Sequence, residues 1–529
     1  MNNTSSPVRS GAAFAVALLL AQSALAGDPP PPAAPPPPAA PPAAQPIPRP
    51  ATPPPPAAPD VLATGLAPQP GGLTPDEAGK IASKTKHSVR AKQEELKAAA
   101  AKVDQAYVNF FPRVSLSATY TRLSSVTPFS LGGGGGLVGA ANTGLLKVGA
   151  CPNSTDNNCV VDSKGQPAGV TSVSFPVVLN STSFVASLAV PLSDYLLRIS
   201  QGYASASHAE KSKRLEVQAE ELQAAGDAKI AYFNWVQARG GAIVAKQAVD
   251  QTKAHLEDAG KAFTVGLVSR ADVLRLEAQV AAAQQGLAQA DAFAMLAEEQ
   301  LRTVLAIPTG TPLVIGADVM HEQATPVGET LDVAQQYAMQ NRLEIRALDE
   351  GEAAVKETVS LARAGYYPRL DAFADATYAN PNQRVFPSRD QFDLTWDMGL
   401  RLSWTLNDTF TALGTTAEAK ARVATLVEQK GQLRDGLRLE VTSAYADMQK
   451  AGTTIEAAER QLVAAEESLR VRNELFRNGK ATSTDLVDAE AEATRARLSR
   501  LTARVGLLVA RVRYEHATGR DVPRTLASE

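Results

Sequence analysis

The chain has 529 residues, which is enough for more than one domain or for one elongated domain. A formal net charge of -3 gives no overall basicity of the kind that favours binding to nucleic acid. Aromatic residues make up only 5% of the chain while alanine is abundant, so the composition favours long helices packed along narrow seams over a thick globular core.

The N-terminus has the features of a secretory signal peptide over residues 1–26. Arg9 precedes an apolar run at 12–21, and small residues at Ala24 and Ala26 predict cleavage after Ala26. The apolar run is too short for a membrane anchor, and no Cys follows the cleavage site to carry a lipid. No later segment approaches about 18 uninterrupted apolar residues, so we expect an exported chain without a transmembrane helix.

A segment rich in proline and alanine follows the signal peptide. Residues 28–60 are low in complexity, and such a composition favours an extended, semi-rigid polyproline chain without a packed core. We therefore expect a disordered tether over residues 27–73. It is either a periplasmic spacer or a segment that contacts the cell wall.

Most of the remaining chain consists of two copies of one unit. "NFFPRVSLSATYTRL" at 109–123 matches "GYYPRLDAFADATYAN" at 365–380, and "AVPLSDYLLRI" at 189–199 matches "SWTLNDTFTAL" at 403–413. "AFTVGLVSRADVLRLEAQ" at 262–279 is repeated as "LFRNGKATSTDLVDAEAE" at 475–492. We place the first repeat at 74–308, a connector at 309–328, the second repeat at 329–518 and a short tail at 519–529.

Alternation of apolar and polar residues predicts two strands in each repeat, at 114–121, 183–190, 370–379 and 392–404. Strands of this length can cross a bilayer at a tilt, although a half-buried sheet in a soluble domain would show the same alternation. Four strands cannot close a membrane barrel, and open edges are not tolerated in lipid. Spanning strands would therefore need two chains, giving eight strands, or three chains, giving twelve. The first repeat has roughly 42 more residues between its strands than the second, as a loop at 125–180.

Helical patterns fill the rest of each repeat. Long helices are expected at 194–259 and 409–472, with return helices at 270–306 and 484–517 after each Gly turn. Shorter helices at 75–110 and 329–363 lead into the strands, the first with a predicted cap at Thr74-Pro75-Asp76-Glu77. Apolar seams along these helices fit hairpins packed as coiled coils, and a purely structural coiled coil would show the same seams.

The order of these elements, together with "FFPRV", "YYPRL", "PLSD", "TLND", "MQNRLEIRAL" and the two Gly turns, resembles the TolC-type outer-membrane efflux protein family (outer membrane factor). The resemblance covers about residues 74–518. It implies an α+β membrane protein: a homotrimer with a 12-stranded outer-membrane β-barrel, four strands per chain, continued by a long periplasmic α-helical barrel. The implied role is an outer-membrane channel of a tripartite efflux system, a passive exit duct for small molecules delivered by an inner-membrane pump through a periplasmic adaptor (membrane fusion) protein.

The resemblance also assigns roles to individual residues. The adaptor-docking tips would be Val265, Gly266 and Leu267 in the first repeat and Asn478, Gly479 and Lys480 in the second. The periplasmic gate would comprise Asp485, Asp488, Phe476 and Asp272. Threefold symmetry would gather the carboxylates of Asp485 and Asp488 in a ring, where crowding raises carboxylate pKa values. An exposed acidic helix surface is the alternative.

One family residue is replaced. The Arg that follows the second tip Gly in the family is Ala481 here, so the salt bridges that lock the closed state are either missing or rebuilt with Arg477, Lys480 or Arg270.

Other chemistry is sparse in the sequence. The only cysteines, Cys151 and Cys159, lie in the 125–180 loop, which the resemblance places outside the cell, where a disulfide is expected. The five histidines form no spaced cluster, and no phosphate loop, nucleophile elbow or zinc motif occurs, so we expect no enzyme, cofactor or metal site. Two alternatives to the efflux duct remain: the exit duct of a type I protein secretion system, and a soluble periplasmic coiled-coil scaffold.

Overall fold

The computed structural model of the chain describes residues 60–125, 130–131, 137–139, 144–151, 155, 157–171, 173–174, 178–321 and 328–523. The chain divides into the units Met1–Ala58 and Pro59–Glu529, and the second unit contains all described residues. The expected signal peptide, most of the expected tether and parts of the 125–180 loop lie outside the described residues.

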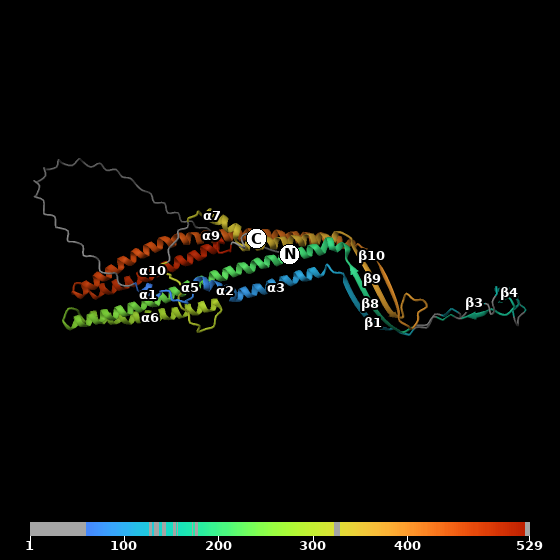
Figure 1. The fold of residues 1–529 in the computed structure, drawn as a ribbon, viewed down its shortest axis with the longest axis horizontal. Helices are drawn as coiled ribbons and strands as arrows, with labels where there is room; N and C mark the ends of the chain where they lie inside the picture. The colour runs from blue at the N-terminus through green and yellow to red at the C-terminus, as the bar shows by residue number, and fades with distance from the viewer. Residues whose placement is uncertain are drawn as a thin grey trace, which may run out of the picture. The chain divides into compact units, whose positions relative to one another are not determined.

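Two long helical hairpins dominate the unit Pro59–Glu529 (Figure 1). α5 (Ser200–Thr264) and α6 (Arg270–Leu305) form the first, and α9 (Leu406–Arg477) and α10 (Ser483–Thr518) form the second. α5 contacts α10, so the two hairpins lie side by side. With 72 residues, α9 extends about 110 Å at the α-helical rise. The four long helices predicted from the sequence are confirmed, with ends shifted by a few residues.

A four-stranded antiparallel sheet lies at the end of the hairpins opposite their turns (Figure 1). Its strands are β1 (Arg113–Arg122), β8 (Asn180–Val190), β9 (Arg369–Asn380) and β10 (Asp393–Ser403), in that spatial order. All four predicted strands are confirmed. β1 and β10 form the edges of the sheet, and β8 joins α5 through α4 (Leu192–Asp194) and a π-helical turn, η1 (Tyr195–Ile199).

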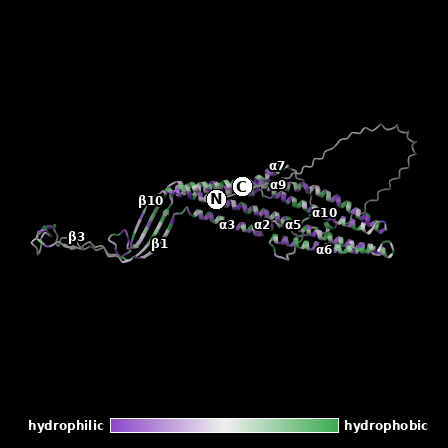
Figure 2. Cartoon of the chain, turned by 180° about the vertical axis from the view of Figure 1, so that it is seen from behind, coloured by the Kyte–Doolittle hydropathy of each residue, from purple (hydrophilic) through white to green (hydrophobic). Residues whose placement is uncertain are grey.

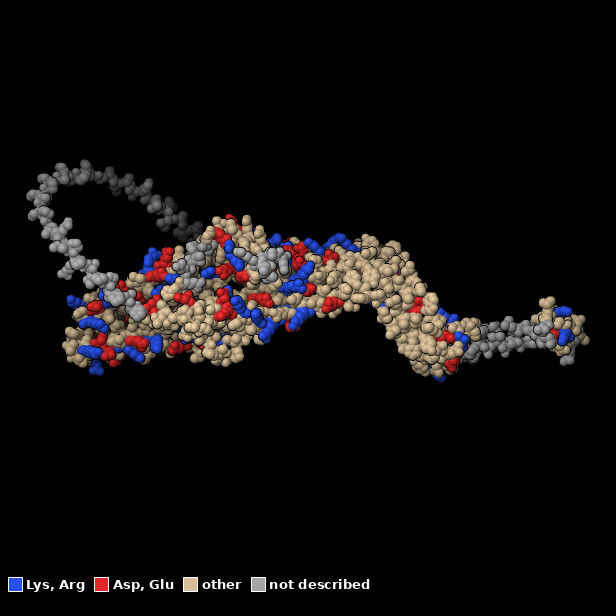
Figure 3. Space-filling view, viewed as in Figure 1, with Lys and Arg blue, Asp and Glu red and all other residues tan. Residues whose placement is uncertain are grey.

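One face of the sheet is apolar because the strand register places apolar residues of neighbouring strands opposite one another. Leu116 lies opposite Ala186, Ala186 opposite Ala376, and Met398 opposite Ala374. Large side chains of the edge strands on this face are 65–81% exposed: Val114, Leu116, Tyr120, Leu394, Trp396, Met398, Leu400 and Leu402. Figure 2 shows the alternation of hydropathy along the strands. In Figure 3 charged side chains are dense over the helices and sparse over much of the sheet. A contiguous apolar surface of this kind marks a contact with lipid or protein.

The loop between β1 and β8 contains three short antiparallel strand pairs. β2 (Ser130–Leu131) pairs with β7 (Val173–Ser174), and β3 (Leu137–Gly139) pairs with β6 (Gly169–Thr171). β4 (Lys147–Gly149) pairs with β5 (Cys159–Val161), and a disulfide joins Cys151 to Cys159 beside this pair.

The two shorter helices are each broken in two, so the prediction of continuous helices at 75–110 and 329–363 is wrong. The first consists of α2 (Pro75–Thr85) and α3 (His87–Val108), and the second of α7 (Leu331–Asn341), α8 (Leu343–Arg363) and the 3-10 turn η2 (Ala364–Tyr366). The breaks fall at Lys86 and Arg342, whose ψ angles are 134° and 125°.

Long-range contacts hold these two breaks, which explains why no Gly or Pro marks them. Lys86 Nζ lies 2.8 Å from an Asp227 carboxylate oxygen on α5. Arg342 lies 3.2 Å from Glu440 on α9 and donates to the His516 carbonyl on α10 at 2.8 Å. The predicted cap at the start of α2 is confirmed, because Thr74 and Glu77 form a reciprocal capping box.

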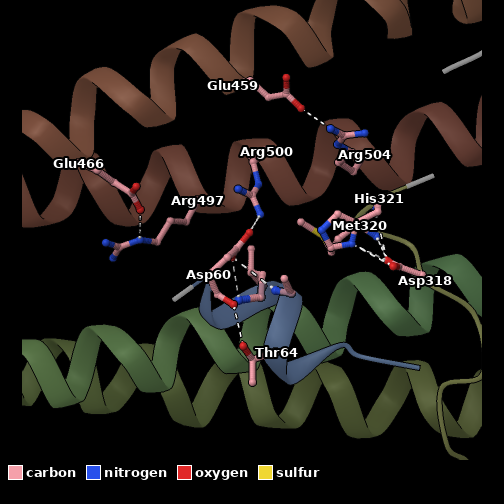
Figure 4. A network of polar contacts seen from close by, with 12 residues as sticks. Asp60, Thr64, Asp318, Met320, His321, Glu459, Glu466, Arg497, Arg500 and Arg504 are labelled. Atoms are coloured by element: carbon pink, nitrogen blue, oxygen red, sulfur yellow. Dashed lines mark hydrogen bonds and ion pairs between the residues drawn. The ribbon is translucent and has the colours of Figure 1, made fainter. Parts of the chain in front are cut away.

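The expected tether ends earlier than predicted, because the chain is packed from Asp60 onward. α1 (Val61–Gly65) is capped by Asp60, and Leu62 and Leu66 are buried in the main core with Tyr232 and Trp235 of α5. Asp60 also pairs with Arg500 of α10 (Figure 4). The two leucines give this short segment enough apolar surface to offset the loss of chain entropy, which the Pro/Ala composition upstream lacks.

No described helix is both long and apolar enough to cross a membrane.

Candidate functional site: the tips of the two hairpins

Both hairpins turn through the same backbone motif. At the first tip the N–H of Leu267 donates to the Ala262 carbonyl at 2.9 Å, and at the second the N–H of Lys480 donates to the Leu475 carbonyl at 2.8 Å. Gly266 and Gly479 adopt φ angles of 77° and 67°, which side chains disfavour. These are Schellman motifs, so each tip glycine is required by the turn itself. Val265 and Leu267 are 69% and 61% exposed at the first tip.

Asp272 and Asp485 occupy the same position in the return helices. Each is the third residue after its cap, and each forms a capping box, with Ser269 and with Thr482 respectively. The Asp485 carboxylate accepts from the Thr482 N–H at 3.0 Å and from its hydroxyl at 2.8 Å. The repeated Asp six residues after each Gly therefore has a local cause, which is to start the return helix.

The second carboxylate oxygen of Asp485 is also engaged within the chain. Arg472 of α9 donates to it at 2.8 Å. The Thr482 hydrogen bonds, aided by Arg472, hold the pKa of Asp485 below its ordinary value. These contacts act against the pKa increase expected from crowding in a ring. Asp488 is exposed, one helical turn further along α10, and its side chain has no hydrogen bond or ion pair within the described part of the chain.

Polar contacts join the two hairpins at their tips. Ser483 Oγ on α10 donates to the Asp272 carboxylate on α6 at 2.5 Å, and Arg275 on α6 donates to the Thr484 hydroxyl on α10. Arg477 at the end of α9 lies 3.0 Å from Asp258 on α5. Of the three basic residues considered as replacements for the missing family Arg, the structure thus shows Arg477 bridging the hairpins.

Phe476 lies inside a core between the hairpins. Its side chain is only 4% exposed and belongs to a cluster that also contains Leu276 of α6 and Leu486 of α10. Ala481 packs against the same cluster. The structure therefore brings Asp272, Phe476 and Asp485 to one end of the hairpin pair, with Phe476 as a packing residue and the two aspartates as helix caps.

A buried polar pair lies further along the same seam and was missed by sequence reasoning. His255 of α5 and Glu490 of α10 are 9% and 2% exposed, and His255 Nε2 lies 3.5 Å from a Glu490 carboxylate oxygen. Neither Glu490 oxygen has a hydrogen bond within the described residues. Glu490 also lines a groove of about 600 Å³ between α5, α6 and α10, and nearly half of the lining residues are Ala or Gly. The only sequence signal was a Glu among the alanines of the α10 seam.

A row of arginines on α10 ties this helix to its neighbours (Figure 4). Arg497 lies 3.2 Å from Glu466 of α9 and donates to Gln251 of α5 at 3.1 Å. Arg504 pairs with Glu459 of α9. Arg497 and Arg504 lie about two turns apart on α10, and their contacts hold the second hairpin together and attach it to the first.

Among the described residues, no group of three or more His, Cys, Asp or Glu side chains is arranged to hold a metal ion.

Several curated proteins are similar to parts of the chain. Nodulation protein T of Rhizobium leguminosarum bv. trifolii is 24% identical over 45% of this chain and 51% of its own length. Outer membrane efflux protein BepC of Brucella suis biovar 1 is 24% identical over 39% of this chain and 44% of its own. Protein CyaE of Bordetella pertussis is 27% identical over 44% of this chain and 48% of its own. The chain spans about half the length of the curated relatives it matches.

Solved structures match over most of the chain. The outer-membrane channel OprN superposes with a TM-score of 0.64 at 19% identity, covering 89% of this chain and 98% of that one. CusC superposes with a TM-score of 0.66 at 14% identity over 84% and 92%, and the open state of the Neisseria gonorrhoeae MtrE channel with 0.63 at 18% over 84% and 88%. These likenesses show a shared fold. The outer membrane efflux protein family matches residues 80–306 and 334–520, so the chain belongs to that family.

Proposed function

We propose that the chain is the outer-membrane channel of a tripartite efflux system, a passive exit duct for small molecules. One observation carries this proposal: a single chain of this family combines a sheet that has one apolar face with two long helical hairpins. The apolar face suits the outer membrane, and the hairpins would extend about 100 Å into the periplasm.

The working unit in this proposal is a homotrimer. β1 and β10 each have one unpaired edge in the described chain, and unpaired edges are not tolerated in lipid. Three copies would close a twelve-stranded sheet. Exposed apolar side chains on the hairpins support the same assembly, since Met295 of α6 is 73% exposed and Leu439 and Val463 of α9 are 71% and 70% exposed.

The hairpin tips would contact a periplasmic adaptor protein, which couples the duct to an inner-membrane pump. At the first tip Val265 and Leu267 present apolar side chains, and at the second Asn478 and Lys480 present polar ones. Gly266 and Gly479 shape these two surfaces. Docking would thus combine an apolar contact with a polar one.

The periplasmic gate in this proposal is held by the hairpin contacts Ser483–Asp272 and Arg477–Asp258. Because Asp485 is engaged by Thr482 and Arg472, Asp488 is the carboxylate free to line the duct in each of the three copies. Such a ring would attract cations at the entrance.

Complementation of a deletion strain tests the proposal. We expect deletion of the gene to increase susceptibility to dyes, detergents or metals, and the wild-type gene to restore growth. The double variant Val265→Asp/Leu267→Asp should form normal outer-membrane trimers but fail to complement. Leu145→Asp, which alters an even more exposed leucine (84%) in the strand-rich loop, is the control and should complement fully.

Three outcomes would contradict the proposal. A protein recovered in the soluble periplasmic fraction would overturn the membrane duct. Unchanged susceptibility together with loss of one secreted protein would indicate a protein secretion duct. Full complementation by the tip variant would remove the tips from the docking surface.

A further inference from the structure

The two repeats are joined inside the chain by an ion pair where β8 ends and β9 begins. Asp194, from "PLSD" after β8, is 9% exposed, and its carboxylate lies 3.3 Å from Arg369, from "YYPRL" at the start of β9. Beside this pair the N–H of Leu370 donates to Ser193 Oγ at 3.0 Å. This junction therefore has three components: a charge pair, a backbone-to-side-chain hydrogen bond and the adjacent β8–β9 ladder.

The residues of the junction each have a counterpart in the other repeat. Arg113 in "FFPRV" corresponds to Arg369, Asp408 in "TLND" corresponds to Asp194, and Asn407 corresponds to Ser193. The strand registers support this correspondence. Arg113 lies opposite Ala189 and Arg369 lies opposite Ser403, and both of these partners lie five residues before the Asp of their own motif.

The counterparts cannot meet within one chain. Arg113 starts β1 at one edge of the sheet and Asp408 follows β10 at the other edge. Both side chains are exposed, and neither has a hydrogen bond or ion pair within the part of the chain that the structure describes. Asp194 and Arg369 are therefore satisfied while their counterparts are left open at the two free edges.

We propose that β10 of one copy pairs antiparallel with β1 of a neighbouring copy in the register that β8 and β9 already use. Arg113 then pairs with Asp408 of the neighbouring copy, and the Val114 N–H donates to the Asn407 side chain of that copy. This inference rests on the proposed assembly of several copies and adds the residues that meet at the interface.

The register follows from the β8–β9 ladder. Val190 lies opposite Ala372. Val190 is four residues before Asp194, and Ala372 is three residues after Arg369. The counterparts at the same offsets are Trp404 and Leu116. The new interface therefore places Trp404 opposite Leu116, Ser403 opposite Ser117, Leu402 opposite Ala118 and Leu400 opposite Tyr120.

The faces of the two strands provide an independent check. Leu116, Ala118 and Tyr120 lie on the apolar face of β1, and Leu400 and Leu402 lie on the apolar face of β10. A slip of one residue would place these side chains opposite Ser, Thr, Arg or Gly399 and break the apolar face. The inferred register instead continues the apolar face across the interface, as lipid contact requires.

Cysteine cross-linking in the full chain tests the register. Ser117→Cys combined with Ser403→Cys places thiols on directly opposed positions, at about 5 Å between Cβ atoms, whereas Ser117→Cys with Arg401→Cys is displaced by two residues to about 7–8 Å. Oxidation should convert the first variant to covalent oligomers that survive heating in detergent, and should leave the second mostly as monomers. The wild-type chain, whose Cys151 and Cys159 are already joined, gives the background.

Charge exchange tests the ion pair. Arg113→Asp and Asp408→Arg each place like charges together and should lower the temperature at which the oligomer dissociates in detergent. The double variant restores opposite charges and should recover most of the loss. A double variant no more stable than the two singles would overturn the pair.

The outcomes separate this inference from the proposed function. If the wild-type chain forms oligomers and the displaced variant cross-links more readily than the directly opposed variant, the register is overturned and the duct is left intact. A wild-type protein that forms no oligomer in the outer membrane overturns the duct, and the interface with it.

Discussion

Asp272 of α6 and Ser483 of α10 share a hydrogen bond of 2.5 Å, although they belong to different hairpins. The other oxygen of the same carboxylate accepts from Ser269 and starts helix α6. One carboxylate therefore fixes the first tip and attaches the second tip to it. Because Ser483 is fully buried, water cannot replace its hydroxyl as the donor without opening the seam.

Replacing Ser483 by Ala should loosen the contact between the tips. A hydrogen bond to a charged acceptor contributes about 1.5–3 kcal/mol, so we expect a measurable shift of the gate toward open states. The measurement is single-channel conductance in planar bilayers, where longer openings are expected. Ser499→Ala, which removes a hydroxyl of α10 that has no hydrogen bond among the described residues, is the matched control and should have a smaller effect. Equal conductance in Ser483→Ala and wild type would remove this bond from the gate.

Acidic pH should weaken both tips. The Thr482 hydrogen bonds and Arg472 lower the pKa of Asp485 from its ordinary value, and hydrogen bonds from Ser269 and Ser483 lower the pKa of Asp272. A carboxylate whose pKa is lower in the folded state stabilises that state fully above the unfolded pKa. This contribution is lost as the pH falls through the folded pKa.

We therefore expect tip stability to be constant from neutral pH to about pH 4 and to fall below it. Protease cleavage near the second tip, measured against pH, would report this loss. Asp485→Asn cannot titrate at this position, so its cleavage should depend less on pH than that of wild type. Loss of tip protection at pH 5–6 would contradict the assignment to these two carboxylates and point to another group.

Phe476 should behave as a packing residue. Truncation of a buried Phe to Ala costs about 3–5 kcal/mol, so Phe476→Ala should destabilise the tip strongly. Phe476→Leu retains most of the apolar volume and should have a much smaller effect. Hydrogen exchange of the backbone amides in α9 and α10 near the tip is the measurement. A Phe476→Ala variant with unchanged exchange but altered conductance would instead show an aromatic that lines the duct.

The sequence predicted the elements well where local chemistry decides them. The Thr74 capping box, the alternation in β10 and the glycines at both tips each depend on neighbours within a few residues, so their patterns are visible in the chain. The repeat strengthened the assignment of the strands and of the tips, since both occur in each half of the chain.

What could not be predicted depends on partners far away in the chain. The break at Arg342 is held by Glu440 and the His516 carbonyl, and nothing near Arg342 in the sequence marks it.

The first repeat also has one more residue between Asp194 and Gly266 than the second has between Asp408 and Gly479. The π-helical turn Tyr195–Ile199 accommodates this extra residue. At the site, the sequence predicted which residues form the two tips. The burial of Phe476 and the contact of Asp485 with Arg472 depend on how the helices pack against one another, which the sequence does not show.

The buried pair of His255 and Glu490 yields the last prediction. Removing one member of a buried pair leaves a polar group without a partner, whereas replacing both members with apolar residues is often neutral or stabilising. His255→Ala should therefore destabilise the seam between α5 and α10, by about 3–5 kcal/mol where the remaining group is charged. The double variant His255→Leu/Glu490→Leu should be close to wild type, since Leu498, Leu501 and several alanines of the groove provide apolar neighbours.

Thermal dissociation of the purified oligomer, followed for both single variants and the double variant, measures this coupling. A double variant less stable than either single variant would show that the seam requires polar side chains at these two positions. It would argue for a proton or cation bound at Glu490 in place of a purely structural pair. Full stability of His255→Ala alone would show that Glu490 does not depend on the histidine and would contradict the coupling.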